Sequence, residues 1–150
     1  MTTSEELITA VSNRARELFD SKKHNCAESA FMALNEIFGG GIEPQAAARI
    51  ATGLGGGLGA TGGTCGALTG CVLALGLLAK CDPAVLRKKT IYPLAADLQE
   101  RFCKEFGSCC CSDLIGDMGD DRRAYCKGVT STAVALCAQM LLEHKNKGEE

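Results

Sequence analysis

The sequence predicts an all-α fold, a single-domain bundle of about six helices, from three observations. Apolar residues recur with a helical period of 3.6 over nearly every long segment. Capping-box sequences stand before two of these segments. No segment alternates apolar and polar residues as a strand does. A chain of 150 residues is long enough to bury a core without cross-links, so residues 1–150 are expected to form one domain.

Two capping boxes mark the first two helices. Thr3 with Glu6, and Asn25 with Glu28, each pair an N-cap residue with a glutamate three positions later. Apolar residues such as Leu7 and Val11, or Ala27 and Phe31, then recur on one face. The expected helices are residues 4–20 and 26–38, the second ended by glycines 39–41.

Prolines and glycines set the remaining boundaries. Pro44 suits the first turn of a third helix, Pro93 should break a later one, and Gly107 should end it. The expected elements are a short helix 44–52, a buried helix 64–80, a broken helix 83–106, an irregular segment 108–119, a last helix 120–144 and a frayed tail 145–150.

Charge and hydropathy exclude two classes of partner. The net charge is −2 and there is no tryptophan, and no run of Lys or Arg, so nucleic-acid binding is not expected. Residues 50–79 carry no charge, but their helical part would rise only about 24 Å against a hydrocarbon core of roughly 30 Å. We expect a buried central helix and no membrane span.

Ten cysteines need an explanation in a chain whose first residues do not resemble a secretion signal. We therefore expect a cytoplasmic protein with thiols that start out reduced, in which such enrichment indicates metal binding or redox chemistry. Zinc is less expected than iron, because Cys-x-x-Cys is absent and only His24 and His144 occur. Four cysteines lack a telling spacing and are expected to be core or incidental surface: Cys71, Cys81, Cys103 and Cys137.

A glycine-rich stretch, residues 53–70, surrounds one cysteine. Its formal dinucleotide fingerprint follows a helix and not a strand, so that interpretation is set aside. Two compatible interpretations stay open. The glycines allow helices to pack closely, or they let bare backbone approach a cofactor and donate N–H groups to its sulfur atoms, with Gly62, Gly63 and Gly66 as the expected contacts.

The cysteines stand in recognisable local sequences. These are Asn25-Cys26-Ala27, Cys65-Gly66-Ala67-Leu68-Thr69-Gly70, Phe106-Gly107-Ser108, Cys111-x-x-Leu114-Ile115-Gly116 and Cys126. Over about residues 20–140 the pattern resembles the redox-active proteins called the C_GCAxxG_C_C family. One departure is Gly66, which follows Cys65 where the family's name has alanine.

The resemblance implies an all-helical fold and thiol- or metal-based redox activity. A similar domain in split-Soret cytochromes is associated with an iron–sulfur centre. The resemblance implies four site cysteines: Cys26, Cys65, Cys111 and Cys126. Within the triplet 109–111, Cys111 has the right offset to Leu-Ile-Gly, and Cys109 and Cys110 are left as candidate resolving thiols.

Two of these cysteines follow expected N-cap residues, Cys26 after Asn25 and Cys65 after Thr64. In the first turn of a helix, free N–H groups and the positive end of the dipole favour thiolate, the form that binds metals. The leading hypothesis is an iron–sulfur electron carrier or sensor. The alternatives are a metal-free thiol–disulfide oxidoreductase and a structural metal-binding or scaffolding module. A redox partner protein is expected, but the sequence does not identify it. The sequence also leaves open whether the protein is a monomer or a homodimer.

Overall fold

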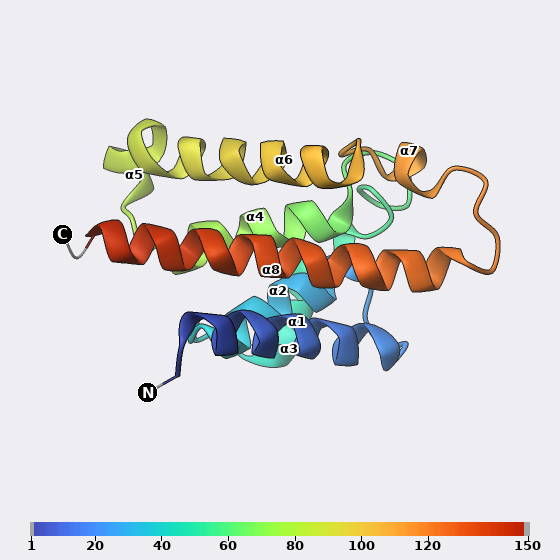
Figure 1. The fold of residues 1–150 in the computed structure, drawn as a ribbon, viewed down its shortest axis with the longest axis horizontal. Helices are drawn as coiled ribbons and strands as arrows, with labels where there is room; N and C mark the ends of the chain where they lie inside the picture. Colours follow the sequence, from blue (N-terminus) through green and yellow to red (C-terminus); the bar gives the residue numbers. More distant parts are fainter. Residues whose placement is uncertain (1, 149–150) are drawn as a thin grey trace.

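The structure is a computed structural model that describes residues 2–148, and it confirms the all-α prediction (Figure 1). A short 3₁₀ turn (Thr52–Leu54) follows the helix Pro44–Ala51, and a π-helical turn (Arg87–Ile91) joins the helices Pro83–Leu86 and Tyr92–Phe106. The described residues hold no strand, only an isolated bridge between Thr64 and Cys110. The helices are α1 (Ser4–Asp20), α2 (Cys26–Ile37), α3 (Pro44–Ala51), α4 (Gly66–Leu78), α5 (Pro83–Leu86), α6 (Tyr92–Phe106), α7 (Cys111–Ile115) and α8 (Arg122–Gly148).

Both expected capping boxes are present. The Thr3 hydroxyl accepts the N–H of Glu6, and the Asn25 side chain accepts the N–H of Glu28, with the glutamates bonding back to the caps. Gly107 ends α6 with a left-handed φ of 85°. These boundaries follow from local chemistry, so the sequence was sufficient to predict them.

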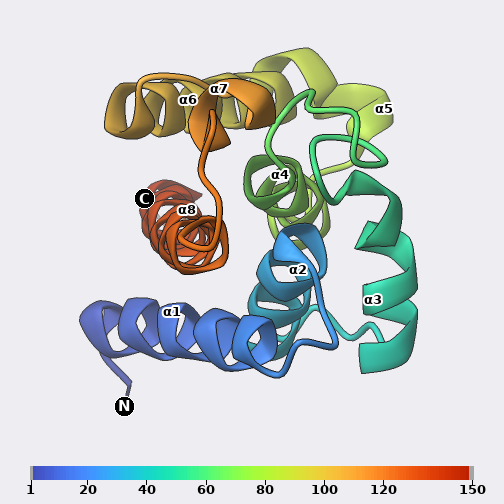
Figure 2. The same cartoon turned by 90° about the vertical axis from the view of Figure 1, so that its right-hand side faces the viewer.

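The long helix α8 lies between α1 and α6 on one side of the bundle (Figures 1 and 2). It packs along α1, α2, α4 and α6, while α2 lies between α1 and α4 and α3 covers the outer side of α2. The largest fully buried side chains come from these packed faces: Leu34, Leu68, Leu75, Leu98, Phe102, Val134 and Met140.

Helices α2 and α4 approach each other closely through glycine. A Cβ built on Gly70 would lie 2.7 Å from the carbonyl oxygen of Ala27, and one on Gly66 would lie 3.3 Å from the Ala27 Cβ. Real Cβ atoms do not approach backbone at 2.7 Å. The interpretation of these glycines as a close helix contact is therefore confirmed.

Two boundary predictions were wrong in detail. The segment expected to be irregular contains the short helix α7, because Leu114 can pack into the core there. The last helix begins at Arg122 and continues to Gly148, so residues 145–148 are helical and not a frayed tail. The break near Pro93 is confirmed, as a π-helical turn before Tyr92. Residues 149–150 lie outside the described part.

Helix α4 is the expected buried central helix, with Ala67, Leu68, Cys71 and Ala74 buried. Within residues 2–148, no single helix has both the length and the hydropathy of a membrane span. Only α4 taken together with Pro83–Phe106 passes on length and composition, and these two are bent by 111°.

Candidate functional site

Four cysteines from four different elements meet at one end of the bundle. Cys26 is the first residue of α2, Cys65 is the N-cap of α4, Cys111 is the first residue of α7, and Cys126 lies near the start of α8. In Figure 1 this is the end at which the glycine loop and α7 lie. We call these residues the four-cysteine group.

Three of the thiols, those of Cys26, Cys65 and Cys126, lie close together around one small cavity. A Cβ on Gly66, directly after Cys65, would lie 2.7 Å from the Cys26 Sγ. A cavity of about 20 Å³ lies between Cys26, Cys65 and Cys126, which is room for about one water molecule. Its other walls are Leu114, Tyr125, Val129 and Thr130.

Cys111 belongs to the same group because its charge affects the pKa of the other three thiols. Its negative charge, when ionised, raises the pKa of Cys26, Cys65 and Cys126. Such mutual repulsion requires the sulfurs to be near one another in a poorly solvated place. Cys65 and Cys111 are each only 8% exposed, so they form the inner half of the group.

Burial raises the pKa of the Cys65 thiol to about 12, and the charge of Cys26 adds to this rise. The N–H groups of Ala67 and Leu68, in the first turn of α4, act in the opposite direction. Cys65 is the N-cap residue of α4, but its sulfur makes no capping hydrogen bond, and the loss of water on burial outweighs the effect of the helix N-terminus. In the metal-free chain this thiol is protonated at neutral pH.

Burial also raises the pKa of Cys26 and of Cys126, and their neighbours in the group add to it. The N–H of Gly56 and the guanidinium of Arg122 lower the pKa of Cys26 and Cys126 respectively, without reversing the direction. The prediction that helix N-termini would favour thiolate here was wrong in its net direction. The expected N-cap Thr64 was also wrong by one residue, because Cys65 itself is the cap.

The glycine loop forms a left-handed turn against the group. Residues 56–60 all have positive φ, between 61° and 74°, a conformation that glycine adopts at little cost. A Cβ on Gly57 would lie 2.7 Å from the Cys111 Cβ. The loop needs glycine because backbone and cysteine side chains share this space.

The three glycines predicted to contact a cofactor have different roles in the described backbone. The N–H groups of Gly62 and Gly63 donate within the loop, to Gly56 O at 3.1 Å and Gly57 O at 2.8 Å. Their carbonyls accept the N–H groups of Ser112 and Cys111 at 3.1 Å and 2.6 Å. They therefore anchor the segment that carries Cys111. Gly66 touches the Cys26 sulfur, and a cofactor contact there stays a prediction.

A second, larger cavity of about 360 Å³ opens beside the group. Cys26 and Cys126 line it as well as the small cavity, so these two thiols face outwards while Cys65 and Cys111 lie behind. Arg122, whose positive charge lowers the pKa of Cys126, stands at its wall. The remaining lining residues are Phe19, His24, Asn25, Gly56, Gly119, Asp120 and Arg123.

One disulfide is present, between Cys103 and Cys109, with their Cα atoms 5.3 Å apart. The other eight cysteines, all among the described residues, are free thiols. The expectation that Cys103 is core or incidental surface, and that all thiols start out reduced, was wrong for this pair. The signal lay in Gly107, because a left-handed C-cap turns the chain back onto the last helical turn. Cys109, expected as a candidate resolving thiol, is bonded to Cys103, and its role as a resolving thiol stays a prediction.

The other cysteines lie outside the group. Cys71 and Cys137 are completely buried, as expected of core residues, and the Cys137 thiol lies 3.7 Å from the Cys71 carbonyl oxygen. Cys81 is half-buried, with its thiol 3.4 Å from the Ala79 carbonyl oxygen. Cys110, the other candidate resolving thiol, donates to the Gly62 carbonyl at 3.1 Å.

Sequence reasoning also missed Arg122. Its position four residues before Cys126 on the same helix places the two side chains on one face, a spacing that could have indicated the pair. Within residues 2–148, no three His, Cys, Asp or Glu side chains are oriented to hold a metal ion. The four-cysteine group supplies four thiols, the donor type that zinc and iron–sulfur clusters take, but its side chains are arranged as free thiols.

Comparison with known proteins gives the family. The sequence model of the family described as "Putative redox-active protein (C_GCAxxG_C_C)" matches residues 24–140. An uncharacterized protein of Archaeoglobus fulgidus is 28% identical over 143 residues, which cover 88% of this chain and 93% of that protein. No solved structure matches. The helical fold, the cysteine spacing and the matched range together show that the chain belongs to the C_GCAxxG_C_C family of redox-active proteins.

Proposed function

We propose that the four-cysteine group binds an iron–sulfur cluster and that the protein acts as an electron carrier or redox sensor. The observation that carries the proposal is the convergence of four thiols from α2, α4, α7 and α8. Four cysteine thiolates are the usual ligands of small iron–sulfur clusters. When bound, such a cluster supplies one-electron transfer.

The raised pKa values support a metal over free thiolates. Cys65, with a pKa of about 12, cannot serve as an active nucleophile at neutral pH. Several buried thiols whose charges repel one another are stable only as neutral groups, or with a cation among them that offsets both the burial and the repulsion. A site of this kind binds a metal with release of protons, so its affinity should rise with pH.

The chain offers further groups suited to an anionic centre. The N–H of Gly56 lowers the pKa of Cys26, and the N–H groups of Ala67 and Leu68 lower that of Cys65, so each favours the anionic form of its sulfur. Arg122 adds a positive charge at Cys126. These donors would orient the ligands and tune the potential. The 20 Å³ between the thiols is too small for a cluster, so binding requires Cys26 and Cys126 to turn, and the adjoining 360 Å³ cavity provides the room.

Metal-free thiol–disulfide chemistry is the second candidate, favoured by the disulfide between Cys103 and Cys109. In this case two cysteines of the group would cycle between thiols and a disulfide. Such a protein would lose two thiols per reversible oxidation and contain no iron.

The test is anaerobic purification of the whole chain, followed by assays for iron, acid-labile sulfide and zinc and a visible spectrum. Cluster binding predicts colour with iron and sulfide in equal amounts. Zinc without sulfide would indicate a structural metal. A colourless protein in which two of Cys26, Cys65, Cys111 and Cys126 reversibly form a disulfide, as located by peptide mass spectrometry, would support thiol–disulfide exchange in place of a cluster.

A further inference from the structure

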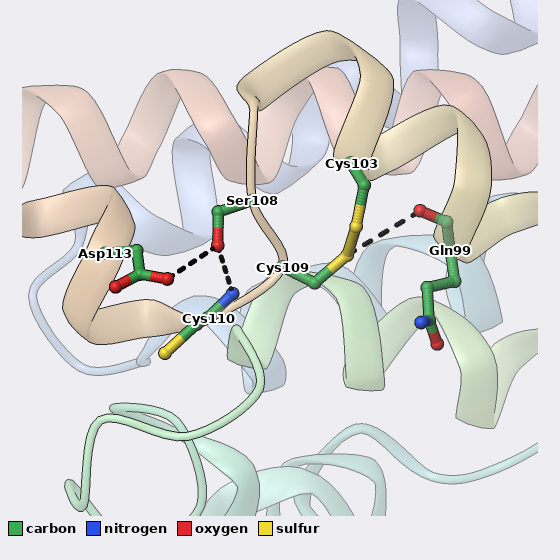
Figure 3. The surroundings of a disulfide bond; sticks show 6 residues. All are labelled: Gln99, Cys103, Ser108, Cys109, Cys110 and Asp113. Carbon is green, nitrogen blue, oxygen red and sulfur yellow. Dashed lines mark hydrogen bonds between the residues drawn. A yellow bond between two sulfur atoms is a disulfide. The ribbon is translucent and has the colours of Figure 1, made fainter.

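The Cys103–Cys109 disulfide lies next to the four-cysteine group without being part of it. Cys103 is in the last turn of α6, and Cys109 follows the Gly107 turn (Figure 3). Both residues are half-buried, and of the two it is Cys109 that packs against the core. Neither residue is fully buried, so an outside thiol can approach the bond between them.

The segment fixed by this disulfide is also hydrogen-bonded to the site. The Cys109 carbonyl accepts the N–H of Cys65 at 2.8 Å, and the Cys111 N–H donates to Gly63 at 2.6 Å. The Ser108 hydroxyl accepts the N–H of Cys110 at 3.0 Å and donates to the Asp113 carboxylate at 3.1 Å (Figure 3). Two inner cysteines of the group, Cys65 and Cys111, are thus attached directly to the segment that the disulfide holds against α6.

A single disulfide among ten cysteines calls for its own explanation. A secreted protein stabilised by disulfides would pair most of its cysteines, whereas eight here are free thiols. An isolated disulfide in a chain rich in free thiols is typical of redox-sensing or redox-active pairs.

We propose that Cys103 and Cys109 form a second redox centre, which exchanges with an external dithiol and controls access to the four-cysteine group. This inference rests on the proposed function only because it takes the four-cysteine group to be the functional site of the protein. The reductant is a small dithiol or a dithiol protein. Its class is set by the chemistry of a partly exposed disulfide, which a dithiol reduces by exchange.

The exchange proceeds in two steps. A thiolate of the external dithiol attacks the Cys103 sulfur, which forms a mixed disulfide and releases Cys109 as a thiolate that takes up a proton. The second thiol of the donor then attacks the mixed disulfide, releases Cys103 as a thiol and leaves the donor oxidised. The protein gains two electrons and two protons, and the donor loses the same.

The reduced form has a hydrogen-bond acceptor in place for the new thiol. The Cys109 sulfur lies 3.6 Å from the Gln99 carbonyl oxygen, a contact that becomes an S–H···O hydrogen bond once the sulfur carries a proton (Figure 3). Without the covalent link to α6, only non-covalent contacts hold the segment that contains Cys109 and Cys111. The group is then expected to open more often, which exposes Cys65 and Cys111.

The test uses metal-free whole protein, so that its result does not depend on cluster binding. The protein is equilibrated with dithiothreitol mixtures of graded potential, pulsed with iodoacetamide, and each cysteine is followed by peptide mass spectrometry. Cys103 and Cys109 should be reduced together in one two-electron step. With their reduction, alkylation of Cys65 and Cys111 should accelerate by about tenfold or more, as local opening becomes easier.

Two variants and one internal reference make the result specific. Cys103→Ser cannot form the disulfide and should show the faster alkylation at every potential. Cys81→Ser, which removes a thiol outside both centres, should behave like the wild type. Cys137, completely buried between helices, should stay protected throughout.

Three results would overturn the inference. The first is the absence of a Cys103–Cys109 bond without reductant, and the second is an equal alkylation rate of Cys65 and Cys111 in the oxidised and reduced protein. The third is an equal acceleration of alkylation at Cys137, which would mean general unfolding. None of these bears on the iron and sulfide assays. Failure of the redox control and failure of the cluster proposal are therefore distinguishable.

Discussion

Cys65 should react far more slowly with alkylating agents in the folded chain than in the unfolded chain, although it is the N-cap of a helix. Burial raises its pKa from 9.0 to about 12. At pH 7 the thiolate fraction then falls about a thousandfold below that of an unshifted thiol, because each pKa unit changes it by about tenfold. Since only thiolate reacts with iodoacetamide, the native residue should be alkylated at least that much more slowly than in the unfolded chain.

The assay compares the same cysteine in two states. Metal-free protein with the Cys103–Cys109 bond intact is alkylated at pH 7 with and without urea, and Cys65 is followed by peptide mass spectrometry. The native rate should also rise by about tenfold per pH unit, up to a pH near 12. If native Cys65 is alkylated within about tenfold of its unfolded rate, the argument from burial is refuted.

The same shift has a consequence for stability. The unfolded chain loses the Cys65 proton near pH 9, and the folded chain keeps it to about 12, so the unfolded state binds fewer protons between these values. Stability is then unaffected below about pH 9 and falls as the pH rises towards 12. At pH 10 the loss from this one residue is about 1.4 kcal/mol, measurable by urea unfolding.

Three further predictions concern packing and the disulfide. Gly70→Ala should lower the free energy of unfolding in urea by about 2 kcal/mol, because its Cβ would meet the Ala27 carbonyl at 2.7 Å. Gly76→Ala, in open space on the same helix, should raise it by about 1 kcal/mol. Equal stabilities of the two variants would contradict the close contact. Cys137→Ser should cost about 1–3 kcal/mol by placing a hydroxyl in the core, with metal content per folded molecule unchanged, and a loss of metal would disprove its assignment as core. Cys103→Ser should lower the stability of the oxidised protein by about 2 kcal/mol, for a closed loop with a sequence separation of 6, and leave that of the reduced protein nearly unchanged.

Helix boundaries were predictable where a local rule fixes them. Asn25 and Glu28 form their capping box from side chains three residues apart. Gly107 adopts the left-handed C-cap conformation because glycine has no Cβ that would clash there. The N-cap of α4 was misplaced by one residue because Cys65 gives its own N–H to Cys109, a contact between segments distant in sequence.

The electrostatics of the site could not be read from the sequence. A helix N-terminus alone predicts a lowered thiol pKa, and its effect is present at Cys65 in the N–H groups of Ala67 and Leu68. Burial, which depends on the whole fold, outweighs it. The disulfide was missed for a similar reason, because a spacing of six residues pairs Cys103 with Cys109 only when a turn at Gly107 reverses the chain.

The most direct test of the four-cysteine group is anaerobic native mass spectrometry of single cysteine-to-serine variants after reconstitution with iron and sulfide. The account predicts that replacing any of Cys26, Cys65, Cys111 or Cys126 abolishes or weakens the bound cluster. It predicts equally that replacing any of Cys71, Cys81, Cys110 or Cys137 leaves the cluster mass in place. A cluster that survives loss of each of the first four, or that disappears with one of the second four in a folded variant, would contradict it.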